Sequence, residues 1–142
     1  MSASVGAETL VAGKGAGAPL KLEEPLSFWG GLDPTTGLIS DRWHPQCGMS
    51  VAGRALMMPA GRGSSSGSAS LAEAIRLGFG PAAILLLERD AIVVVGAMVA
   101  AELYGRERPV SLVNVRDWER LALGRRLVVA ASPEGTTIAV ET

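Results

Sequence analysis

Short apolar runs alternate with segments of helical periodicity in the middle of the chain. Residues 54–59, 82–87 and 109–115 are largely apolar over the length of a strand, a pattern typical of strands that are buried on both faces. Over residues 68–77 the apolar positions recur every three to four residues, so this segment is predicted to be a helix. The alternation of strand and helix predicts parallel strands that are joined by helical crossovers.

The segment from 91 to 104 carries signals for both a helix and a strand. Its β-branched residues 93–95 favour a strand, whereas the second half, Ala-Met-Val-Ala-Ala-Glu-Leu-Tyr, is rich in good helix formers. Asp90 is suited to cap a helix at its start, and Gly105 is suited to end it. We therefore predict a helix from 91 to 104.

The two ends of the chain complete the predicted fold. Residues 1–9 are small and polar and are expected to be a flexible N-terminus, so the folded domain is placed at 10–142. Residues 10–22 predict one or two strands with a bend, and residues 127–131 and 136–140 predict a closing pair. The prediction is one α/β domain, a mixed sheet with helical crossovers and antiparallel strands at both ends.

Composition excludes several classes of function. With 48% apolar residues, a chain of 142 residues can bury its own core and is not expected to be disordered. Basic and acidic side chains nearly cancel, 13 against 14, without a basic run, which argues against a nucleic-acid surface. The longest apolar run, 91–101, is too short to cross a membrane, and residues 1–17 lack the layout of a signal peptide. We expect a cytoplasmic protein.

A glycine- and serine-rich segment, Gly-Arg-Gly-Ser-Ser-Ser-Gly-Ser over residues 61–68, connects a predicted strand to the predicted helix. Its glycines allow the backbone to approach a ligand closely, and the amides at the start of a helix favour negative charge. A serine hydroxyl in that field is stabilised as an alkoxide, or it stabilises an oxyanion on a substrate. The same composition also occurs in linkers and helix caps. The segment does not match a Walker A phosphate loop, because no Lys-Ser or Lys-Thr pair follows a glycine.

Two further stretches stand beside residues 59–68: Phe-Trp-Gly-Gly-Leu-Asp-Pro-Thr-Thr-Gly at 28–37 and the His-Pro pair at 44–45. Together the three stretches resemble the small subunit of aconitase X proteins, and the resemblance covers roughly residues 10 to 115. It implies the swivelling β/β/α domain of the aconitase superfamily, which closes over a larger body. It also implies that this body, the large subunit, holds an iron or iron–sulfur cluster through its own cysteines. The single cysteine of this chain could not hold such a cluster alone.

The resemblance implies a role for each residue of the glycine–serine segment. Ser64 would be the catalytic base that removes a carbon-bound proton from a small hydroxy acid, while the metal of the partner acts on the departing hydroxyl. Arg62, Gly63, Ser65 and Ser66 would bind the substrate or support the segment. A serine base needs preorganised N–H donors and a closed, dry site. The chain is accordingly expected to be inactive without the large subunit.

Two substrates are open within the family that the chain resembles. One is cis-3-hydroxy-L-proline, which is dehydrated to Δ1-pyrroline-2-carboxylate, and the other is mevalonate 5-phosphate of the isoprenoid pathway. The Gly-Arg-Gly-Ser-Ser sequence and the N-terminal extension favour hydroxyproline, because the archaeal members tend to carry Gly-Lys-Gly-Ser-Thr and to begin at the first strand. A non-catalytic binding module on the same fold is the further alternative, and the intact segment favours the enzyme.

Several residues outside the segment have two interpretations. The lone Cys47 near the lone His44 is more often structural than a metal pair. Glu88 and Asp90 follow a predicted strand, where substrate-facing residues occur, although a helix cap explains Asp90 equally well. The tryptophans are expected to be interface anchors and the methionines core residues: Trp29, Trp43 and Trp118, and Met57, Met58 and Met98.

Overall fold

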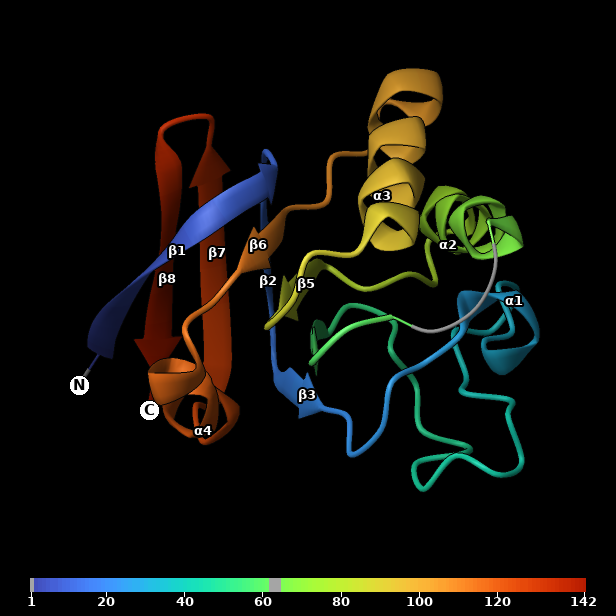
Figure 1. The fold of residues 1–142 in the computed structure, drawn as a ribbon, viewed down its shortest axis with the longest axis horizontal. Helices are drawn as coiled ribbons and strands as arrows, with labels where there is room; N and C mark the ends of the chain where they lie inside the picture. Colours follow the sequence, from blue (N-terminus) through green and yellow to red (C-terminus); the bar gives the residue numbers. More distant parts are fainter. Residues whose placement is uncertain (1, 62–64) are drawn as a thin grey trace.

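One mixed sheet organises the computed structural model, which describes residues 2–61 and 65–142. Across these ranges eight strands lie in the order β2-β7-β8-β1-β6-β5-β4-β3 (Figure 1). Strands β3 to β6 are parallel, and β2, β7, β8 and β1 are antiparallel to their neighbours. The strands are β1 (Ser2–Val11), β2 (Gly13–Gly17), β3 (Pro19–Lys21), β4 (Ala55–Met58), β5 (Ala83–Leu86), β6 (Val110–Leu112), β7 (Arg126–Ser132) and β8 (Gly135–Glu141).

The helices follow the predicted crossovers. Helix α2 connects β4 to β5, and α3 connects β5 to β6, so the predicted alternation of strand and helix is confirmed. Helix α3 has the predicted bounds, while α2 begins two residues before the predicted start at 68. In the described part of the chain no helix is long and apolar enough to cross a membrane. The helices are α1 (Phe28–Gly31), α2 (Ser66–Leu77), α3 (Ala91–Tyr104) and α4 (Trp118–Ala122), and the 3-10 turn η1 (Val115–Asp117) precedes α4.

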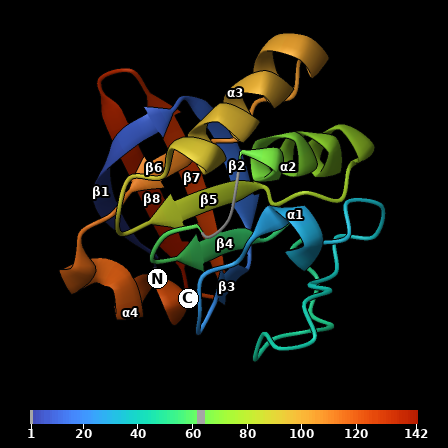
Figure 2. The ribbon, with the colours of Figure 1, turned by 45° about the vertical axis from the view of Figure 1, so that its right-hand side comes forward.

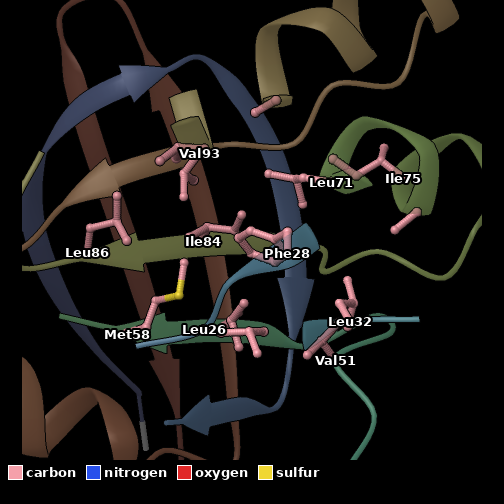
Figure 3. Packing of buried hydrophobic residues seen from close by; sticks show 14 of the residues in the cluster. Leu26, Phe28, Leu32, Val51, Met58, Leu71, Ile75, Ile84, Leu86 and Val93 are labelled. Carbon is pink, nitrogen blue, oxygen red and sulfur yellow. The ribbon is translucent and has the colours of Figure 1, made fainter. Parts of the chain in front are cut away.

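Strands β4 and β5 are apolar throughout because both of their faces are covered. Ile84 and Leu86 point toward helices α2 and α3, where they join a cluster that includes Leu71 (Figure 3). The alternate residues of the two strands lie on the other face, where Met57 of β4 and Leu85 of β5 pack with residues of β7, β8 and α4. Since the side chains of a strand alternate between faces, burial on both sides requires the continuous apolar runs seen in the sequence.

Strand β1 joins the two halves of the sheet, and its position differs from the expected flexible N-terminus at 1–9. It pairs with β8 on one edge and with β6 on the other. The side chain of Val5 is buried, and Thr136 bonds through its hydroxyl to both Thr9 and Ser111. The small residues of this segment have weak strand propensity. Pairing on both edges outweighs that propensity, because it satisfies the backbone N–H and C=O groups.

Two other expectations about large side chains are wrong. Trp118, expected to be an interface anchor, begins α4 and packs in the core cluster beneath the sheet, with an exposed fraction of 8%. Met98, expected in the core, lies on the outer face of α3 and is 49% exposed. Helix α3 is apolar on nearly all sides, so its sequence does not reveal which face meets the sheet.

The sheet curls so far that strand β2 passes close to the backbone beside β4 and β5. A Cβ atom on Gly15 would lie 2.0 Å from the carbonyl oxygen of Ala82, and one on Gly17 would lie 2.1 Å from that of Gly53. Such distances leave no room for a side chain, so glycine is required at both positions by close approach of the backbones.

We predict that Gly15→Ala lowers the free energy of unfolding by about 2–3 kcal/mol, because the added methyl group displaces backbone rather than a mobile side chain. The matched control is Gly6→Ala on β1, where a Cβ would meet no other described atom within 4 Å. Urea unfolding of both variants checks the prediction. Equal stability of the two variants would show that β2 does not approach β5 in this way.

Candidate functional site

The glycine–serine segment lies between β4 and α2, as the sequence predicts. Ser65 and Ser66 are exposed at the start of α2, a helix of 12 residues. Their hydroxyls therefore lie where the backbone amides of a helix favour negative charge. Arg62, Gly63 and Ser64 lie outside the described residues, so the expected base and two of its expected neighbours stay predictions.

The start of the segment is attached to the residue that caps α3. The N–H of Gly61 donates to Oδ2 of Asp90 at 2.7 Å, and Gly61 also forms an isolated parallel bridge with Leu26. Oδ1 of Asp90 accepts the N–H groups of Ile92 and Val93 at 2.9 and 3.1 Å. The predicted helix cap is therefore confirmed, and the same carboxylate has a second partner in the candidate site.

The end of the segment is attached to α3 as well. Oγ of Ser68 donates to the carbonyl oxygen of Ile92 at 2.7 Å. Gly67 is buried, and Gly96 of α3 lets the two helices approach, since a Cβ there would lie 2.9 Å from the carbonyl oxygen of Ser68. Glu88, the other acidic residue after β5, is exposed. The bond from Ser68 to Ile92 was not predicted, because its partner is 24 residues away.

Two tryptophans lie exposed on the long connection between β3 and β4. Trp29 belongs to α1, which packs against α2 (Figure 2), and its side chain is 63% exposed. Its backbone nitrogen would lie 3.9 Å from a Cβ on Gly67, so it is a neighbour of the glycine–serine segment. Trp43 is 93% exposed. Side chains of this size and exposure are typical of residues that a partner protein covers.

His44 has a structural role within the same connection. It is buried, its Nε2 bonds to the carbonyl oxygen of Glu24 at 3.0 Å, and its Nδ1 accepts the N–H of Gln46 at 3.0 Å. The Gln46 side chain in turn accepts the N–H of Glu23 and donates to the carbonyl oxygen of Lys21. These bonds fasten the turn that carries Trp43 to the chain after β3. The contribution of Gln46 was not predicted, since an isolated glutamine carries no sequence signal.

The remaining polar residues of this connection also bond locally. The hydroxyl and the N–H of Thr35 both donate to Asp33, and these bonds hold the pKa of that carboxyl below its usual value. Asp41 accepts the N–H of Trp43 at 2.9 Å. Cys47 is exposed. Among residues 2–61 and 65–142, no three His, Cys, Asp or Glu side chains gather where they could hold a metal ion.

Comparison with known proteins places this geometry in a family. The sequence model described as "Aconitase X swivel domain" matches residues 4–140. A cis-3-hydroxy-L-proline dehydratase of Pseudomonas aeruginosa is 48% identical over 124 residues, which are 82% of this chain and 21% of that protein. A phosphomevalonate dehydratase small subunit of Thermococcus onnurineus is 35% identical over 122 residues, 86% of this chain and 88% of that protein.

A solved structure confirms the predicted fold class. The crystal structure of Thermococcus kodakaraensis aconitase X in its holo form superposes with a TM-score of 0.79, at 28% sequence identity and with 99% of each chain covered. The chain spans about a fifth of the length of the first curated relatives that it matches, whereas it spans most of the small subunit from Thermococcus onnurineus.

We predict that His44→Ala lowers the free energy of unfolding by about 1–3 kcal/mol, because it leaves two backbone groups without their ring partner. Limited proteolysis should then cleave the connection between β3 and β4 faster than in the original protein. Cys47→Ser is the matched control from the same turn, and we expect a change within about 0.5 kcal/mol there. An unchanged cleavage rate in the His44 variant would contradict the structural role of the ring.

Proposed function

The chain belongs to the aconitase X swivel-domain family, and we propose that it is the small subunit of a two-subunit dehydratase for cis-3-hydroxy-L-proline. The observation that carries this proposal is the 48% identity with a cis-3-hydroxy-L-proline dehydratase over 82% of the chain. At comparable coverage, the identity with a phosphomevalonate dehydratase small subunit is 35%. The closer similarity favours hydroxyproline as the substrate and Δ1-pyrroline-2-carboxylate as the product.

A second candidate is the small subunit of a phosphomevalonate dehydratase. It is favoured by a relative named as such a small subunit, which is 35% identical over 86% of this chain. A small subunit implies a large one, and the match covers 21% of the hydroxyproline dehydratase, so most of that enzyme lies outside the matched domain. We therefore propose a large aconitase X subunit as the partner under either substrate.

The iron or iron–sulfur cluster that we propose for the assembly would be held by that partner. The described residues of this chain do not fit the group, because no three candidate ligands gather among them. The chain's own contribution is a set of polar groups at the start of α2. Ser65 and Ser66 are exposed there and can donate to a carboxylate or another oxygen of a small substrate.

Dehydration of a hydroxy acid requires that a proton leaves carbon while the hydroxyl on the neighbouring carbon departs. We propose that Ser64 accepts the proton as an alkoxide, that Arg62 pairs with the substrate carboxylate, and that Gly63 lets the backbone come close. A serine is a weak base in water. The amides at the start of a helix stabilise its alkoxide, and closure against the partner, which excludes water, strengthens that effect.

We predict that Ser64→Ala lowers kcat of the complex with the large subunit by about a hundredfold or more, the usual contribution of a general base. The matched control is Ser4→Ala, which removes an exposed hydroxyl from β1 and should leave kcat unchanged. Assembly of both variants with the partner is checked by size-exclusion chromatography. Full turnover by an assembled Ser64→Ala complex would rule out this serine as the base.

The substrate is decided by steady-state assays of the same complex on both candidates. We expect kcat/KM for cis-3-hydroxy-L-proline to exceed that for mevalonate 5-phosphate by about tenfold or more, since the two compounds differ in size and charge and a polar site built for one leaves its groups unpaired with the other. Preference for mevalonate 5-phosphate would establish the second candidate instead. An assembled complex that turns over neither compound would support a binding module without activity.

A further inference from the structure

Asp90 lies at a junction of three elements near the candidate site. It follows β5, it caps α3 through Oδ1, and its Oδ2 accepts the N–H of Gly61, where the glycine–serine segment begins. A helix cap uses one acceptor oxygen. The second oxygen therefore serves a partner that capping does not require.

The backbone at Gly61 is fitted closely to this carboxylate. A Cβ at Gly61 would lie 2.4 Å from Oδ2 of Asp90, so any other residue would push the two apart. On its other side Gly61 bridges to Leu26, whose side chain is buried. Just before it, the carbonyl oxygen of Pro59 accepts the N–H groups of Leu87 and Glu88 at 3.0 and 2.9 Å. The chain entering the segment is thus held between fixed elements.

The far end of the segment is held by the same turn of α3. Ser68 donates its hydroxyl to the carbonyl oxygen of Ile92, two residues beyond Asp90. Both described ends of the segment therefore bond to residues 90–92. A carboxylate that accepts a backbone N–H forms a charge-assisted bond, which is roughly twice as strong as a neutral one.

We propose that Asp90 is a positioning residue that fixes the backbone at Gly61 and, together with Ser68, sets the ends of the glycine–serine segment. The catalytic consequence rests on the proposed function, in which this segment meets the substrate. Misplacement of a reacting group by about 1 Å costs on the order of a hundredfold in rate. The anchor thus has a larger effect on turnover than on stability.

Two substitutions separate anchoring from capping. Asparagine and serine are both good helix caps, so Asp90→Asn and Asp90→Ser keep a side-chain oxygen for Ile92 and Val93. Asparagine then turns its NH₂ group, a donor, toward the N–H of Gly61, while serine offers no second oxygen there. Both variants are expected to keep α3 and to lose the bond to Gly61.

Amide hydrogen exchange, followed by NMR on the full chain, tests the anchor without any assay of activity. We expect the Gly61 amide to exchange about tenfold faster or more in both variants, as the loss of one charge-assisted bond implies. The amides of Ile92 and Val93 should keep their protection. Unchanged exchange at Gly61, or equal loss at all three amides, would show that Asp90 is a helix cap alone.

Steady-state kinetics of the assembled complex test the catalytic consequence. We expect kcat to fall by about tenfold to a hundredfold in both Asp90 variants with KM changed much less, because the geometry of the segment is altered. The matched control is Asn114→Ser, which changes the cap of η1 and should leave kcat within about twofold of the original value.

The outcomes distinguish this proposal from the proposed function. Faster exchange at Gly61 with unchanged kcat would overturn the positioning role and leave the dehydratase intact. A complex of the unaltered chain without turnover would overturn the proposed function, while the exchange measurement would still decide whether Asp90 anchors Gly61. A fall of kcat in Asn114→Ser equal to that of the Asp90 variants would show a general effect of exchanging one cap residue for another, and would contradict positioning.

Discussion

The burial of both faces of the β4–β5 pair is the constraint on which the rest of the structure depends. One face packs under helices α2 and α3, and the other packs on the antiparallel strands and α4. If this parallel pair slid along the helices, or along the antiparallel strands and α4, it would expose apolar surface to water. The carboxyl ends of the two strands are therefore fixed relative to each other, and both connections that leave them begin from defined positions.

The candidate site follows directly from those fixed ends. The chain leaving β4 runs beside the chain leaving β5 as far as Gly61 and Asp90, where a backbone amide meets a carboxylate. Helix α2 then packs on α3, where the backbone of Ser68 comes so near to Gly96 that no side chain would fit there. The polar residues at the start of α2 are thus attached to the rigid layer of the domain. Under the proposed function, in which the segment meets a substrate held by the large subunit, such rigidity is an advantage, since a loosely held group loses the benefit of orientation.

The sequence predicts the parts of the fold that depend on local pattern. The apolar runs of β4 and β5 and the helix from 91 to 104 were predictable, because burial on both faces and capping by Asp90 leave signals in short windows. Strand β1 and the burial of Trp118 were not predictable, since both arise from pairing and packing with distant residues. The bond between Gly61 and Asp90 spans 29 residues. The sequence predicted that Asp90 caps α3. It could not show that the other oxygen of this carboxylate accepts the N–H of Gly61 at the start of the glycine–serine segment.

The exposed residues beside the segment bear on how the domain meets its proposed partner. Trp29 lies next to the start of α2, and the turn that carries Trp43 is fastened by His44 and Gln46 rather than left free. Fixing the backbone of an exposed turn costs conformational entropy. A partner that buries Trp43 would benefit from the fixed turn, because a preorganised segment loses less freedom on binding. Under the proposed function, the fastened turn and the anchored segment serve one requirement, that this domain present a fixed surface to its proposed partner.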